Sequence, residues 1–186
     1  DYIDPMFHSI VVATKSRKLD IFMLGENTCR YLLAKNSRNC DIAVLEGVMG
    51  YYDGISTTTE GSAYALAKVT ETPVVLVINA TGASLSLAAL IQGFKDFRID
   101  SNIRGAILNN ISPMTYAYYK DAIEKETGVK LLGYMPKMEG CGFESRHLGL
   151  ITAEEINDLQ VIVDRLAKQA EATIDLKSII EIAKTA

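Results

Sequence analysis

The sequence predicts an α/β domain with a doubly wound, mostly parallel sheet, and two observations support this. Four short apolar runs are bounded by turn residues, as buried parallel strands are. They cover residues 42–45, 74–78, 105–108 and 130–134. Segments with helical spacing separate the runs at intervals of about 30 residues, which is the pattern of βαβ units.

Helical segments are predicted at six places, and local start and stop residues support several of them. They cover residues 19–34, 62–69, 85–97 and 116–127, a segment that begins at 152, and residues 175–183. Asp20 lies near the start of the first, Pro73 follows the second, and Gly128 is a plausible residue to end the fourth. Thr152 is expected to cap the fifth, with acids in its first turn. No repeat or low-complexity linker interrupts the pattern, so residues 1–186 are predicted to form a single domain.

Composition narrows the class of protein. The 186 residues are 48% apolar and 23% charged, an ordinary balance for a globular domain with a sizeable core. The net charge of −4, without a Lys- or Arg-rich run, predicts neither nucleic acid nor a membrane as partner. No apolar stretch approaches the roughly 20 residues that span a bilayer. The three cysteines have no metal-ligand spacing and no secretion signal is visible, so a cytoplasmic location is expected.

The segment from Asp41 to Gly54 is the strongest candidate for a site. Its apolar run ends in Glu46, and a glycine-rich stretch then leads to Asp53. Open α/β sheets bind ligands at the carboxyl ends of their strands, where Glu46 is expected to lie. The pair could hold a metal–nucleotide complex or act on a bound substrate. The alternatives are a solvated acid at a strand end for Glu46 and a turn former before glycine for Asp53.

The other predicted strands are followed by Asn79, Asn109 and Pro136. If the strands are parallel, these residues and Glu46 line one crevice. The asparagines could contact a nucleotide base, although asparagine after a strand is also common turn chemistry.

Two other chemistries have weaker support in the sequence. Cys141 lies between glycines near His147, but no strand feeds this turn as a nucleophile elbow requires. No G-x-x-x-x-G-K-[ST] phosphate loop occurs in the sequence. Glu46, an acid after a predicted strand, nevertheless resembles the acid that helps to hold Mg²⁺ in proteins with such a loop.

Six motifs, in order over nearly the whole chain, resemble one family. They are DYIDPMFH from residue 1, LEGVMGYYDG from 45, PVVLVI from 73, GAILN from 105, LGYMP from 132 and SRHLGL from 145. The chain resembles the cobyrinic acid a,c-diamide synthases, which amidate corrin side chains in cobalamin biosynthesis.

The resemblance implies a dethiobiotin-synthetase-like P-loop NTPase domain that lacks its P-loop segment. In the family, this domain uses ATP and Mg²⁺ to phosphorylate a substrate carboxylate, and ammonia from a following glutaminase domain attacks the acyl phosphate. The resemblance therefore implies a corrinoid substrate, with the a and c acetates as the reacting groups. The phosphate loop is expected before residue 1 and the glutaminase after residue 186, so this fragment alone is expected to be inactive. A homodimer is a further expected assembly.

The resemblance also implies residue roles. Asp4, Glu46 and Asp53 are implied to be catalytic, with Asp4 and Glu46 also at the metal and Asp53 at the activated intermediate. The implied substrate-binding residues are Asp1, Tyr2, Ile3, His8, Arg146 and His147. Asn109 is implied to contact the adenine edge. Asn79 lies where an aspartate is expected, so no metal role is assigned to it.

Two kinds of alternative stay open. Within the same class, hydrogenobyrinic acid and nickel-sirohydrochlorin a,c-diamide synthases fit the motifs equally well, because the metal of the macrocycle has no recognisable residue pattern. In another class, the absent phosphate loop would suit a non-catalytic binding or regulatory module. The retained Asp4, Glu46 and Asp53 favour the enzyme.

Overall fold

A parallel three-stranded sheet lies at the centre of the protein. The structure is a computed structural model and describes residues 8–9, 11, 16–141, 145–146, 149–150 and 159–186. The strands are β1 (Val74–Asn79), β2 (Ile103–Asn109) and β3 (Lys130–Met135), hydrogen-bonded in that order and all parallel. The three predicted strands from residue 74 onward are confirmed.

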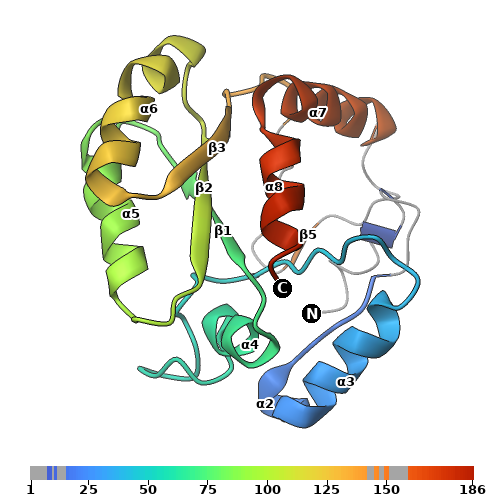
Figure 1. The fold of residues 1–186 in the computed structure, drawn as a ribbon. Coiled ribbons are helices and arrows are strands. Elements are labelled where there is room, and N and C mark those ends of the chain that lie inside the picture. The colour runs from blue at the N-terminus through green and yellow to red at the C-terminus, as the bar shows by residue number, and fades with distance from the viewer. Residues whose placement is uncertain (1–7, 10, 12–15, 142–144, 147–148, 151–158) are drawn as a thin grey trace.

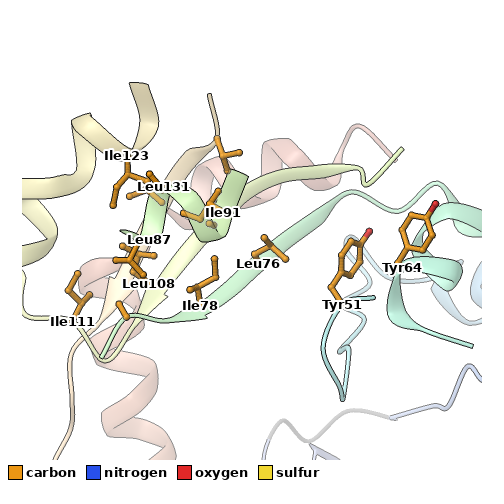
Figure 2. Packing of buried hydrophobic residues seen from close by; sticks show 14 of the residues in the cluster. Tyr51, Tyr64, Leu76, Ile78, Leu87, Ile91, Leu108, Ile111, Ile123 and Leu131 are labelled. Atoms are coloured by element: carbon orange, nitrogen blue, oxygen red, sulfur yellow. The ribbon is translucent and has the colours of Figure 1, made fainter. Parts of the chain in front are cut away.

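Helices cover both faces of this sheet, which confirms the predicted α/β fold class (Figure 1). On one face lie α5 (Ser86–Asp96) and α6 (Pro113–Thr127), and on the other lie α7 (Leu159–Thr173) and α8 (Leu176–Ala183). Leu76, Ile78 and Leu108 of the strands pack with helical residues such as Leu87, Ile91 and Ile123 in one buried cluster (Figure 2). No helix in the described part of the chain is long and apolar enough to cross a membrane.

Local residues begin and end several of the predicted helices, and Gly128 does so as predicted. The Ser62 hydroxyl caps α4 (Ala63–Thr70) by accepting a hydrogen bond from the Ala65 N–H. Gly128, with φ of 62°, ends α6 in the left-handed conformation that glycine adopts at low cost. Asp175 caps α8 through the Ser178 N–H.

The helix predicted over residues 19–34 is two helices, α2 (Ile21–Leu24) and α3 (Glu26–Ser37). Asp20 caps the first, as predicted. Gly25 separates them because its φ of 73° does not fit a right-handed helix. Two short antiparallel strands, β4 (Ser145–Arg146) and β5 (Gly149–Leu150), were not predicted. The predicted helix start at residue 152 lies outside the described residues.

The strand predicted over residues 42–45 is wrong for this structure. Residues 42–48 have no regular secondary structure, and the Val44 side chain is 91% exposed. A strand needs a neighbour to satisfy its backbone N–H and C=O groups. In the described residues, β1 pairs with β2 alone, and no strand runs beside residues 42–45. Hydrophobic composition alone therefore does not produce a strand here.

The glycine at position 133 allows the chain after α7 to cross β3 closely. Gly133 has φ of 136°, and a Cβ there would lie 2.3 Å from the Thr173 carbonyl oxygen. Gly133→Ala should therefore lower the free energy of unfolding by about 2–4 kcal/mol, measured by urea denaturation. Gly93→Ala is the matched control, because its added Cβ meets nothing within 4 Å in helix α5. That change should leave stability unchanged or raise it slightly; equal losses for both variants would contradict this account.

Asp175 links α8 to β3 and makes this junction sensitive to acid. Hydrogen bonds from Ser178, and then the nearby Lys130 ammonium, lower the pKa of Asp175 to about 2. Its folded pKa lies below the unfolded value, so its stabilising contribution is present above about pH 4 and lost as pH falls toward about 2. Asp175→Asn keeps a capping oxygen but removes the charge. The difference in Tm between wild type and Asp175→Asn should shrink over that range; a constant difference would refute the linkage.

Candidate functional site

The carboxyl ends of the three strands form one row of side chains. Asn79 is in register with Asn109, and Asn109 is in register with Met135. Pro136 follows directly, so three of the four predicted strand-end residues belong to one edge. This is the edge at which open α/β sheets bind ligands. Glu46, the fourth, does not follow a strand.

Side-chain amides connect the loops that leave β1 and β2. The Asn79 Oδ1 accepts hydrogen bonds from the Thr81 N–H at 3.2 Å, the Thr81 hydroxyl at 2.8 Å and the Asn110 Nδ2 at 3.2 Å. The Asn110 backbone N–H donates to the Asn109 Oδ1 at 3.1 Å. We call these four residues (Asn79, Thr81, Asn109 and Asn110) the amide corner.

Backbone hydrogen bonds fix the position of the amide corner. The Ala80 N–H donates to the Asn109 carbonyl at 2.8 Å, and the Ile111 N–H donates to the Met135 carbonyl at 3.2 Å. Ala80 and Ile111 are both buried. The ladder of the sheet thus continues beyond the last strand residues. Asn109 remains half-buried, and an amide offers the donor and acceptor that pair with an adenine edge.

Glu46 contacts His8, and both come from motifs that the sequence analysis selected. The His8 Nε2 lies 3.2 Å from the Glu46 Oε2. The Glu46 side chain is 58% exposed, so its carboxylate is accessible to a ligand. Carboxylate oxygens are ligands that Mg²⁺ accepts. Within the described residues, no group of three or more His, Cys, Asp or Glu side chains is arranged to hold a metal ion.

Asp53 lies in a tight turn in which close backbone contacts require glycine at the next position, Gly54. Its N–H donates to the Gly50 carbonyl at 2.9 Å. A Cβ on Gly50 would collide with the Asp53 carboxylate, and a Cβ on Gly54 would lie 2.3 Å from the Glu60 carbonyl oxygen. The turn therefore holds the exposed Asp53 carboxylate over Gly50. No hydrogen bond or ion pair of the described residues joins Asp53 to Glu46.

Two tyrosines next to Asp53 attach this turn to the body of the domain. The Tyr51 hydroxyl donates to the Ser101 carbonyl at 2.5 Å, and the Tyr52 hydroxyl donates to the Phe94 carbonyl at 2.6 Å. Figure 2 shows Tyr51 and Tyr64 side by side at one end of the buried cluster. Burial raises the pKa of both Tyr51 and Tyr52, so their hydroxyls stay protonated and able to donate.

Tyr64 extends this aromatic cluster to an ion pair. Its hydroxyl donates to the Asp100 carboxylate at 2.7 Å, and Lys68 lies 2.8 Å from the same carboxylate. The hydrogen bonds from Lys68 and Tyr64 lower the pKa of Asp100. The tyrosine anchors were not predicted from the sequence. Adjacent tyrosines between two turn glycines are the pattern that could have suggested them.

The described residues do not include five of the predicted site residues: Asp1, Tyr2, Ile3, Asp4 and His147. The backbone of Arg146 belongs to β4. The structure thus brings together Asn79 with Asn109, and His8 with Glu46.

An apolar hollow of about 470 Å³ lies where α7 meets the carboxyl end of β3. Met135, the register neighbour of Asn109, lines it together with residues of α7 and with Ile174. Its lining is apolar, so it offers no hydrogen-bond donors to a phosphate group.

A parallel sheet covered on both faces, with polar residues at its carboxyl edge, defines an α/β domain of the open-sheet class. Residues 13–145 match the family model described as "AAA domain", and the chain belongs to this family. The comparison with solved structures found no match.

Curated relatives confirm the resemblance seen in the motifs. The chain is 42% identical to cobyrinate a,c-diamide synthase of Thermoplasma acidophilum, over 100% of this chain and 42% of that protein. It is 43% identical to the Fusobacterium nucleatum protein of the same name, over 98% of this chain and 41% of that protein. The Priestia megaterium protein is 37% identical over 98% and 40%, respectively. The chain spans about two fifths of the length of these relatives.

The tyrosine anchors predict a stability effect. Tyr51→Phe removes the donor to the buried Ser101 carbonyl and should lower the free energy of unfolding by about 1–2 kcal/mol. Tyr118→Phe is the control, because Tyr118 is 78% exposed and its hydroxyl makes no hydrogen bond within the described part of the chain. Chemical denaturation of both variants makes the comparison. Equal stabilities would show that the Tyr51 hydroxyl does not anchor the turn.

Proposed function

We propose that this chain is the ATP-dependent amidoligase part of a cobyrinate a,c-diamide synthase. The proposed reaction converts the a and c acetate carboxylates of cobyrinic acid into amides, with ammonia released from glutamine. Similarity to enzymes of that name over the whole chain carries the proposal. The Glu46 and Asp53 motif and the amide corner add chemistry that suits it.

The chemistry explains why such a domain needs a nucleotide. A carboxylate is a poor electrophile because its negative charge repels nucleophiles. In the proposed reaction, a carboxylate oxygen attacks the γ-phosphorus of ATP and ADP leaves, which gives an acyl phosphate. The nitrogen of ammonia then attacks the acyl carbon, phosphate leaves, and the nitrogen loses a proton. Mg²⁺, when bound, would offset the crowding of negative charge between the phosphates and the carboxylate.

The residues are proposed to divide this work. The exposed Glu46 carboxylate suits Mg²⁺, and Asp4 would share the ion. His8, which contacts Glu46, would bind the substrate next to the metal ion. Asp53, held by its glycine turn and tyrosine anchors, would act at the activated carboxylate. Asn109 would bind the adenine edge.

The remaining roles belong to the substrate and to further parts of the enzyme. Asp1, Tyr2 and Ile3 would orient the tetrapyrrole, and Arg146 and His147 would contact it. A phosphate-binding loop and a glutaminase domain would complete the catalytic unit. The relatives are long enough to hold such parts, since this chain covers only about two fifths of them.

A chimera supplies that context for a direct test. The region of the Thermoplasma acidophilum enzyme that aligns with this chain is replaced by residues 1–186, and amide formation is followed by mass spectrometry. The chimera should amidate cobyrinic acid with ATP and glutamine. Glu46→Gln should lower the rate at least about 100-fold, because it removes a charged ligand and leaves an isosteric amide.

Controls separate the possible failures of this test. Glu139→Gln is the matched control at an acid outside the proposed site, and its rate should not change. Glutamine hydrolysis by the chimera should survive Glu46→Gln, because the glutaminase is a separate domain. Full amidation by Glu46→Gln would refute the metal role. If the chimera amidates only hydrogenobyrinic acid or only nickel-sirohydrochlorin, that compound replaces cobyrinic acid as the proposed substrate.

A further inference from the structure

Among the described side chains at the carboxyl edge, the Asn79 amide oxygen accepts the most hydrogen bonds, although Asn79 has no role in the proposed reaction. Its Oδ1 receives three hydrogen bonds, two from Thr81 and one from the Asn110 Nδ2. The last of these crosses from the loop after β1 to the loop after β2. Asn79 is exposed, so nothing in core packing requires this arrangement.

The bond to Asn79 holds Asn110 in an unusual backbone conformation. Asn110 has φ of 59°, in the left-handed region that asparagine tolerates better than most residues. The hydrogen bond to Asn79 fixes its side chain, and the buried neighbour Ile111 fixes the backbone that follows. In this conformation the Asn110 N–H is directed at the Asn109 Oδ1, 3.1 Å away.

This contact determines which way round the Asn109 amide lies. If the amide rotated by 180°, its NH₂ group would face the Asn110 N–H, and two donors would oppose each other. The oxygen therefore stays on the Asn110 side and the NH₂ group on the other. Asn109 consequently presents its donor and its acceptor in one fixed order.

We propose that Asn79 is a positioning residue that makes the Asn109 amide select adenine over guanine. The inference rests on the proposed function, in which Asn109 contacts the base. An asparagine amide pairs with adenine through N6–H₂ as donor and N7 as acceptor, whereas guanine presents two acceptors, O6 and N7, on the same edge. An amide that could turn over would lose this selectivity.

Nucleotide titrations of the chimera, which has the parts proposed to complete the nucleotide site, test the proposal without any catalytic step. ATP and GTP are titrated into the chimera and its variants by isothermal titration calorimetry, with glutamine and the corrinoid left out so that no turnover occurs. The wild type should prefer ATP to GTP by about tenfold or more. Asn79→Leu removes the acceptor and should reduce this preference to about one, mainly through weaker ATP binding.

Three further variants make the result specific. Asn79→Asp keeps an acceptor for all three donors and should retain the preference. Asn36→Leu makes the same change as Asn79→Leu at an exposed asparagine of α3, outside the amide corner, so it should also behave like the wild type. Asn110→Gly tolerates positive φ but lacks the side chain, so it should lose the preference even if Asn79→Leu fails to fold. Thermal melts confirm that each variant is folded.

Each outcome decides a separate point. A wild type that binds ATP no better than GTP, or binds neither, overturns the base contact by Asn109 and with it the role of Asn79. A wild type that discriminates, together with Asn79→Leu or Asn110→Gly variants that discriminate equally, overturns the role of Asn79 alone. If Asn79→Asp loses the preference for ATP, an acceptor oxygen at position 79 is not what maintains the selectivity.

Discussion

The parallel hydrogen-bond ladder that joins β1, β2 and β3 determines where every polar group at the carboxyl edge lies. Because the strands are parallel and in register, Asn79, Asn109 and Met135 come to the same level of the sheet. The ladder then continues through the N–H groups of Ala80 and Ile111 into the loops. A shift of one residue in the register of β1 against β2 would place Asn79 and Asn109 on opposite faces of the sheet. The hydrogen bonds of the amide corner could then not form.

The aromatic cluster gives the Asp53 turn a comparable but independent support. Tyr52 attaches it to α5, and Tyr51 attaches it to the chain between α5 and β2, through hydrogen bonds to main-chain carbonyls. The proposed base contact of Asn109 thus depends on the amide corner, whereas the proposed role of Asp53 depends on the tyrosine anchors. A substitution in one part should leave the other in place, which allows their contributions to be measured separately.

The sequence predicted secondary structure correctly where the local pattern agreed with the neighbouring elements in the fold. The runs after residue 74 became strands because each has a strand beside it, and Ser62, Gly128 and Asp175 ended or began helices through their own backbone and side-chain chemistry. The run at 42–45 has the same composition but no partner in the described residues. Residues 19–34 divided at Gly25, whose effect depends on a positive φ that the spacing did not indicate. The amide corner could not be predicted in detail, because the bond from Asn110 to Asn79 connects residues 31 positions apart.

The central proposal is that Asn109, held in place by Asn110 and Asn79, contacts the base of ATP. The most direct measurement is a crystal structure of the chimera with a non-hydrolysable ATP analogue. The adenine N6 and a ring nitrogen should lie within hydrogen-bond distance of the Asn109 amide, with Asn110 still bonded to Asn79. Density for the adenine ring at any other place, with Asn109 in contact with solvent, would contradict the account.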